Sequence, residues 1–313
     1  MRCRVRGAAL VATLVGAIAA EAQTRLVIVS GLGGQPKYSA SFAAWSNALA
    51  EAAKTRAGLP DSMITWLGDP AGPKGTWYRG PSVRDTIELL MSRIAARPVT
   101  EQVVLVLIGH GSGEDADTKI SLPGPDLAAR DFARILGGLG SRRVAFLNLT
   151  SASGDMAEVL AAPGRVVITA TKSAFERNES LFADHFVAAF AQDGADTDKD
   201  DRVSLLEAFA FAQAETKRVY ENDGRMQTEH AQLVDRSGVA RQFFLTPGAS
   251  GRAGGNAALT ALYADREALD AQIQALKAKK AGMATTEYEA ELERLLLELA
   301  RKSIAIRQLE GRP

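Results

Sequence analysis

Two side chains that could perform nucleophilic catalysis follow two apolar runs of the chain. His110 ends the apolar run of LVLIGHGSG (residues 105–113), and Ser151 follows that of AFLNLTSASG (residues 145–154). Apolar runs of this length are typical of buried strands in parallel sheets, and functional residues often lie beyond the carboxyl ends of such strands. A histidine base beside a serine hydroxyl is the arrangement of a hydrolase that forms an acyl intermediate. The spacing predicts that His110 and Ser151 meet at the ends of neighbouring strands.

A serine nucleophile requires more support from its surroundings than a cysteine does. A thiol with a pKa of about 8.5 is partly ionised near neutrality, whereas a serine hydroxyl needs a well-aligned base that a third group orients. Asp115 and Asp117 follow the histidine, but the sequence identifies no clear third group. It therefore leaves open whether Ser151 reacts or stands where a nucleophile has been lost.

The segment DTDKDDRVSLLE (residues 196–207) has the spacing of an EF-hand calcium loop. Its predicted ligands are the carboxylates of Asp196, Asp198 and Asp200, the backbone carbonyl of Arg202, Ser204, and the bidentate carboxylate of Glu207. Position 6 of such loops is normally glycine because it needs a positive φ, and here it is Asp201. We predict Ca²⁺ binding that is weak or structural. The alternative is a solvated acidic turn that caps a helix.

The elements that must position these residues alternate between strands and helices. Apolar runs predict strands at 25–31, 63–69, 103–109, 144–149 and 166–171. Helical periodicity predicts helices at 41–54, 83–96, 126–139, 180–192 and 205–220, and we expect a last short strand at 242–245. This alternation predicts an α/β fold with a mainly parallel sheet and helices on both faces.

The C-terminal part of the chain is separated from this domain by PGASGRAGG (residues 247–255), which has the composition of a flexible linker. Beyond it, residues 256–313 contain two stretches in which apolar residues recur every three or four positions. This pattern predicts a helical hairpin or coiled coil. The hairpin can pack on itself or on the main domain, or it can join copies of the chain into a homo-oligomer, and both interpretations stay open.

The motifs at the strand ends, taken in order, resemble those of the caspase-like peptidases, and within them the legumain-like branch. The resemblance rests on LVLIGHGSG, AFLNLTSASG and VITATKSAFERNES (residues 167–180). In that family, the histidine that ends the central strand pairs with a cysteine that ends the next, in the pattern Ala-Cys-x-Ser-Gly. Here this pattern falls on residues 150–154, with serine in place of the catalytic cysteine. The resemblance implies a caspase-like domain over residues 23–246, similar to those of secreted bacterial relatives.

The resemblance also implies roles for individual residues. It places the histidine on His110 and the degenerate nucleophile on Ser151, with oxyanion donors in the backbone N–H groups around Gly111 and Ser151. It implies that Ser173, Glu176 and Glu179 border a substrate pocket.

Three functions remain open. The first is a catalytically silent domain, a pseudoenzyme, that interacts with a protein or peptide. The second is an active serine-variant hydrolase that uses Ser151 and His110. The third is a small-molecule-binding α/β domain, which GLGGQP (residues 31–36) could suggest, although the segment lacks the full G-x-G-x-x-G pattern.

The N-terminal residues 1–22 have the features of a secretory signal peptide. Three arginines precede an apolar run, and Ala20-Glu21-Ala22 is an A-x-A cleavage site. Cleavage predicts a secreted or periplasmic protein that begins at Gln23, spans no membrane and has no cysteine, because Cys3 is the only one. The balance of 37 Lys and Arg against 37 Asp and Glu argues against a broad nucleic-acid-binding surface.

Overall fold

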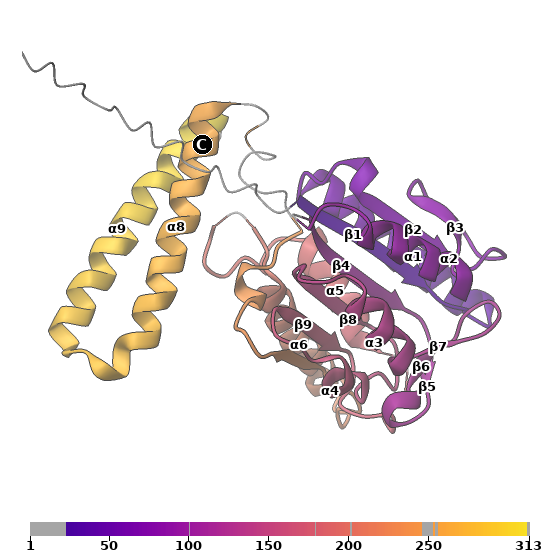
Figure 1. The fold of residues 1–313 in the computed structure, drawn as a ribbon. Helices are drawn as coiled ribbons and strands as arrows, with labels where there is room; N and C mark the ends of the chain where they lie inside the picture. The colour runs from indigo at the N-terminus through magenta and orange to yellow at the C-terminus, as the bar shows by residue number, and fades with distance from the viewer. Residues whose placement is uncertain are drawn as a thin grey trace, which may run out of the picture.

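The computed structural model describes residues 23–99, 101–178, 180–200, 202–245, 253 and 256–311. The predicted signal peptide, most of the predicted linker, Glu179 and Asp201 lie outside the described residues. Figure 1 shows a main domain built on a twisted sheet and two long helices beside it.

The sheet of the main domain has seven strands within the described residues, in the order β10-β9-β8-β4-β1-β2-β3. Its strands are β1 (Gln23–Ser30), β2 (Ile64–Gly68), β3 (Tyr78–Pro81), β4 (Glu101–Ile108), β8 (Val144–Asn148), β9 (Arg165–Thr169) and β10 (Gln232–Asp235). β10 pairs antiparallel with β9, and the other neighbours pair parallel. The predicted, mainly parallel sheet is confirmed, and the most apolar strand, β4, lies in its middle.

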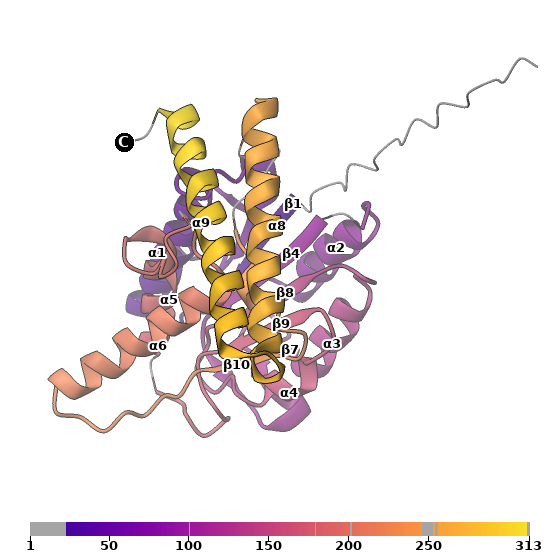
Figure 2. The ribbon, with the colours of Figure 1, turned by 90° about the vertical axis from the view of Figure 1, so that its left-hand side faces the viewer.

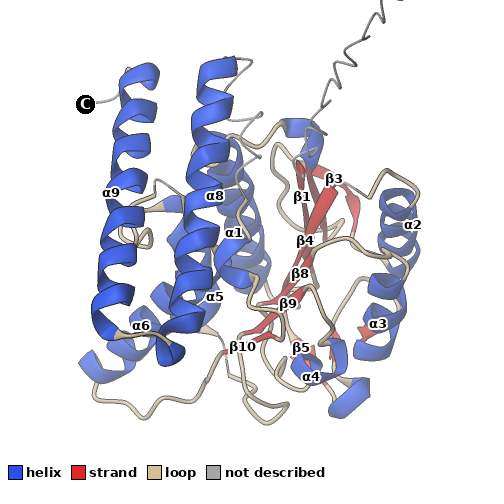
Figure 3. Ribbon diagram, turned by 60° about the vertical axis from the view of Figure 1, so that its left-hand side comes forward, coloured by secondary structure: helices blue, strands red, loops and turns tan. Residues whose placement is uncertain are grey.

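Helices cover both faces of the sheet, as the alternation of elements predicted (Figure 3). One layer contains α1 (Pro36–Thr55), α5 (Leu181–Ala191) and α6 (Leu205–Asn222), and the other contains α2 (Arg84–Ala95), α3 (Ala129–Gly137) and α4 (Met156–Leu160). Along β4, Val104 and Val106 pack with the first layer, whereas Val103 and Leu105 pack with the second. Successive side chains of a strand point to opposite faces, so a strand buried on both sides must be apolar throughout.

Two short elements of the structure were not expected from the sequence. A small antiparallel sheet of β5 (Gly111–Ser112), β6 (Lys119–Ile120) and β7 (Leu127–Ala128) follows His110 directly. β3 lies within a stretch rich in glycine and proline that resembles a loop. Such residues are tolerated at the edge of a sheet, and β3 is the strand at that edge.

The strand expected at residues 242–245 is wrong. Residues 240–242 form a 3₁₀ turn, and Phe244 makes an isolated bridge with Ser204. This segment is apolar because Phe243 and Leu245 are buried in the core of the domain. The strand that completes the sheet is β10, whose two apolar residues stand between Gln232 and Asp235 and are too few to reveal a period.

The C-terminal helices α8 (Ala257–Lys279) and α9 (Thr285–Glu310) lie side by side as a hairpin, which confirms that prediction (Figure 2). Among the described residues, each apolar cluster draws its members either from the main domain or from the hairpin with Ala253 of the linker. Polar contacts link the two, since the Arg202 guanidinium lies 3.3 Å from Glu267 Oε1 and 3.9 Å from Asp270 Oδ2. No helix in the described part of the chain has both the length and the apolar character needed to cross a membrane.

The ends of β4 and β8 approach each other so closely that residue 111 has room for glycine alone. A β-carbon on Gly111 would lie 2.2 Å from the carbonyl oxygen of Ser151. A β-carbon on Gly154 would lie 2.1 Å from the backbone nitrogen of Ser173, which follows β9. Real β-carbons essentially never come within 3.0 Å of such atoms. The glycines of both strand-end motifs are therefore required by packing.

Deletion of residues 256–313 is expected to leave the main domain folded, because the hairpin shares no apolar cluster with it among the described residues. The loss in unfolding free energy should be small, since Arg202 keeps its ion pair with Asp200, and Glu267 and Asp270 are only partly buried. Thermal unfolding followed by circular dichroism measures this. A truncated chain without a cooperative transition would show that the hairpin belongs to the core.

Replacement of Gly111 by alanine is expected to destabilise the domain by about 1–3 kcal/mol, the usual cost of overpacking. The matched control is Gly137→Ala in α3, where a β-carbon would meet no atom within 4 Å. That change should be neutral or should stabilise the helix by roughly 0.5–1 kcal/mol. Urea denaturation of both variants measures the difference, and equal midpoints would contradict the packing argument.

Candidate functional site

The carboxyl ends of β4, β8 and β9 lie at one edge of the sheet, and the candidate catalytic residues follow them. His110 comes after β4, Ser151 after β8 and Ser173 after β9. β8 pairs in parallel with both of its neighbours, β4 and β9. The structure thus brings the turns that carry these three residues together.

Ser151 is 7% exposed and its hydroxyl contacts the backbone of the neighbouring turn. The Gly111 N–H donates a hydrogen bond to Ser151 Oγ over 3.3 Å. Ala152 follows with a φ of +51°, which turns the chain sharply away from the strand. The Gly111 N–H is a group that the family resemblance implies as an oxyanion donor, and here the Ser151 hydroxyl oxygen accepts its hydrogen bond.

The His110 imidazole lies among aromatic rings. Its ring centroid is 4.7 Å from that of Tyr38 and 5.0 Å from that of Phe42, both in edge-on geometry. Its Nε2 lies 3.3 Å from the carbonyl oxygen of Gly33. Within the described residues, neither Ser151 nor a carboxylate is hydrogen-bonded to this ring. A carbonyl oxygen only accepts, so this contact requires a proton on Nε2.

The two aspartates that follow His110 in the sequence make contacts away from its ring. Asp117 forms an ion pair with Arg130 of α3. Asp115 donates its backbone N–H to Asp155 Oδ2 over 3.0 Å. Neither supplies the third group that would orient His110.

A second histidine at the same edge does have a carboxylate partner. His230 Nδ1 lies 2.6 Å from Glu176 Oε1, and the His230 backbone N–H donates to Glu176 Oε2 over 3.0 Å. The backbone oxygen of Glu176 accepts the N–H of Ala152, the residue after Ser151, over 2.8 Å. The His230–Glu176 pair is therefore tied to the turn that carries the nucleophile position.

The sequence did not indicate this pair because its members are 54 positions apart. The signal that was missed is β10, which begins at Gln232. By pairing antiparallel with β9, β10 returns the preceding residues to the carboxyl edge of the sheet. The Gln232 side chain adds a contact between β10 and the turn after β9, since its amide donates to the backbone oxygen of Lys172 over 3.1 Å.

The three residues that the resemblance placed around a pocket differ in the contacts they make. Glu176 is central to the contacts at this edge, because its carboxylate also accepts the Lys172 N–H over 2.9 Å. Ser173 Oγ accepts the N–H of Phe175 within the same turn, over 3.4 Å. Glu179 lies outside the described residues.

The acidic loop between α5 and α6 gathers three of the predicted calcium ligands. Asp196, Asp198 and Glu207 each offer a carboxylate oxygen, and these oxygens lie within 4.8 Å of one another. Glu207 also accepts the Ser204 N–H over 3.0 Å, while Ser204 Oγ accepts the Glu207 N–H over 3.2 Å. This reciprocal pair is a capping box at the start of α6.

The remaining predicted ligands hold other contacts. The Asp200 carboxylate accepts the Arg202 backbone N–H over 2.9 Å, and Arg202 Nη2 lies 2.6 Å from Asp200 Oδ2. The left-handed backbone observed within the described loop is at Lys199, with a φ of +57°. The predicted site of backbone strain, Asp201, lies outside the described residues.

The carboxylates of the loop repel one another. Burial, together with the charges of Asp200, Glu207 and Asp196, raises the pKa of Asp198 to about 6. Burial alone would raise the pKa of Glu207 as well, but hydrogen bonds from Ser204 and Thr197 hold it below its ordinary value. A cation between these groups would relieve the repulsion. Hard carboxylate oxygens are the ligands that Ca²⁺ prefers.

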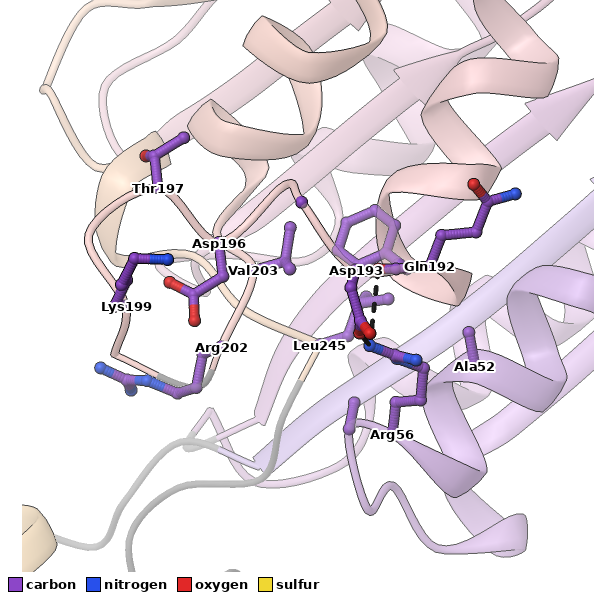
Figure 4. A pocket seen from close by; sticks show the side chains of 13 residues that line it. Ala52, Arg56, Gln192, Asp193, Asp196, Thr197, Lys199, Arg202, Val203 and Leu245 are labelled. Atoms are coloured by element: carbon purple, nitrogen blue, oxygen red, sulfur yellow. Dashed lines mark hydrogen bonds and ion pairs between the residues drawn. The ribbon is translucent and has the colours of Figure 1, made fainter. Parts of the chain in front are cut away.

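A cavity of about 700 Å³ lies beside the acidic loop (Figure 4). It is lined by the C-terminal ends of α1 and α5, by residues of the loop and by Leu245. α1 and α5 follow the carboxyl ends of β1 and β9 and run back along the sheet, so the cavity lies at the opposite edge from Ser151. The ion pair of Arg56 with Asp193 stands at one side of it, and Asp196 and Lys199 stand at the other. This cavity was not expected from the sequence.

Similarity to known proteins is found among solved structures. No family model matches the chain, and no curated protein matches it. The chain is similar in structure to caspase-1 from Spodoptera frugiperda, with 10% sequence identity and a TM-score of 0.45. The matched region covers 70% of this chain and 88% of that chain.

Proposed function

We propose that this chain is a secreted caspase-like or legumain-like domain that is silent as a cysteine peptidase and acts by binding a protein or peptide. Secretion is supported by the signal-peptide features of residues 1–22. The family is supported by the motifs at the ends of β4 and β8, two neighbouring parallel strands. The loss of catalysis is supported by Ser151, which stands where the family has its cysteine.

The observation that carries this proposal is the separate bonding of the two candidate catalytic groups. A general base must have a free lone pair within reach of the hydroxyl proton. His110 Nε2 faces the Gly33 carbonyl at 3.3 Å, so in the neutral imidazole the lone pair is on Nδ1, and within the described residues no hydrogen bond joins the ring to Ser151. Ser151 Oγ accepts its hydrogen bond from Gly111. The described residues therefore show no hydrogen bond that aligns His110 with the Ser151 hydroxyl, as a serine nucleophile needs.

Packing explains how the motifs can persist without their chemistry. Gly111 and Gly154 lie where backbone atoms of neighbouring turns leave no space for a β-carbon. Both glycines would be needed for folding even if no reaction took place at this edge. A domain of this kind keeps the form of the peptidase motifs while Ser151 remains unreactive.

The alternative function, an active serine-variant hydrolase, is favoured by one observation. The carboxylate of Glu176 lies 2.6 Å from His230 Nδ1, which is how a triad carboxylate orients its histidine. In this alternative His230, and not His110, is the base, and Ser151 is the nucleophile one residue from the backbone contact with Glu176.

A fluorophosphonate probe followed by peptide mapping is expected to leave Ser151 unlabelled, because no base is aligned with its hydroxyl. Ser151→Cys is expected to gain slow peptide hydrolysis, since a thiol needs less activation, and His110→Ala should abolish that gain. Specific labelling of Ser151 in the unmodified chain would overturn the silent domain. Loss of that labelling in His230→Ala but not in His110→Ala would assign the base to His230.

We propose in addition that residues 196–207 bind Ca²⁺. The support is the grouping of the Asp196, Asp198 and Glu207 oxygens within 4.8 Å and the repulsion that raises the pKa of Asp198. Asp200, Arg202 and Ser204 complete the proposed ligand set by their spacing. Asp200 would have to share its carboxylate between the ion and Arg202.

Millimolar Ca²⁺ is expected to raise the Tm of the full chain, because the ion binds the folded loop and not the unfolded one. Asp198→Asn should raise the Tm without Ca²⁺, by removing a repelling charge, and should abolish the response to the ion. Asp193→Asn, a change just outside the loop, is the matched control and should keep the response. Isothermal titration with neither heat nor a Tm shift would refute the calcium site.

A further inference from the structure

The side of α9 that faces away from α8 carries exposed apolar side chains. Leu296, Leu297 and Ile304 are 47%, 52% and 47% exposed. Leu297 and Ile304 are seven positions apart, and the exposed Ala290 and Ala300 continue the same line along the helix with spacings of three and four. These residues form what we call the outer stripe of α9: Ala290, Leu296, Leu297, Ala300 and Ile304.

The opposite side of α9 is already used for packing. Tyr288, Leu295 and Ile306 are buried in the clusters that join α9 to α8. On a helical projection these three positions lie about 180° from Leu297. In a helix with one apolar side, packing against α8 would bury all of the apolar surface. α9 has a second apolar side, which this packing leaves exposed. The second, the outer stripe, has the heptad spacing by which helices pair.

Charges along α9 are divided by sign. The first half contains Glu287, Glu289, Glu291 and Glu293, and the second contains Arg301, Lys302 and Arg307. Arg294, Glu298 and Glu310 depart from the division, and Arg294 pairs within the helix with Glu291 and Glu298. A parallel neighbour of the same sequence would place like charges together. An antiparallel neighbour would place the acidic half of each helix beside the basic half of the other.

We propose that the outer stripe is a homodimer interface, in which the α9 helices of two copies pack antiparallel about Leu297. Ala290 and Ile304 lie seven positions before and after Leu297, so a two-fold axis there brings the small side chain of one copy against the large one of the other. The same patch then serves both partners, as a closed two-fold dimer requires. The occupant of the stripe is a second copy of this chain, and this pairing does not depend on the chemistry at Ser151.

Sedimentation equilibrium of the full chain is expected to give the mass of two chains. Leu297→Glu and Ile304→Glu should each weaken self-association by at least about tenfold, because each buries a charge at the centre of the pairing surface. The matched control is Leu89→Glu on α2, a leucine that is 50% exposed, and this variant should remain dimeric. Circular dichroism identifies any variant that fails to fold. A monomeric unmodified chain, or dimers that both stripe variants leave intact, would overturn the interface.

Cysteine cross-linking tests the antiparallel direction. In a chain with Cys3→Ser, which then has no cysteine, Ala290→Cys and Ile304→Cys are introduced separately. Antiparallel pairing predicts that an oxidised mixture of the two variants gives disulfides joining residue 290 to residue 304, and that each variant alone gives few. Peptide mapping distinguishes the products. Disulfides joining 290 to 290 and 304 to 304 would indicate parallel helices and overturn the proposed arrangement.

Discussion

The contact between the turns that end β4 and β8 is the constraint on which the candidate site depends. The Ser151 carbonyl occupies the space that a side chain at residue 111 would need. That contact fixes the distance between the two strand ends, and with it the hydrogen bond from the Gly111 N–H to Ser151 Oγ. The same kind of contact recurs one strand further along, between Gly154 and the turn after β9. The edge of the sheet is therefore held by backbone packing, whatever chemistry its side chains perform.

This constraint separates the shape of the site from its reactivity. Interior packing leaves no freedom at a glycine that touches a neighbouring backbone, whereas a nucleophile can be exchanged for a similar side chain at little cost in volume. The proposed replacement of a cysteine by Ser151 fits such an exchange, because it would alter the acidity of the group and hardly its size. The imidazole of His110 likewise has a packing role, since it lies edge-on to the rings of Tyr38 and Phe42.

The sequence predicted the parts of the fold that have a strong period. β4 and the helices that flank the sheet carry long apolar patterns, and β4 alternates between two cores because both of its faces are buried. β10 is too short to show a period, and its partner β9 is distant in the sequence. Because β10 was not predicted, the pairing of His230 with Glu176 was not predicted either. That pairing forms only because the chain runs back beside β9 in β10. Side-chain contacts of this kind follow from tertiary structure and leave no local pattern.

Arg202 makes the acidic loop and the hairpin one electrostatic unit. Arg202 is 7% exposed, and its guanidinium pairs with Asp200 in the loop and with Glu267 and Asp270 on α8. Burial and the charge of Asp200 raise the pKa of Asp270, so the two carboxylates compete for one cation. A buried guanidinium needs a counter-charge. If Asp200 were neutralised, Arg202 would depend on the carboxylates of Glu267 and Asp270 on α8. The ion pairs that hold the hairpin against the main domain therefore depend on the charge of Asp200 in the acidic loop.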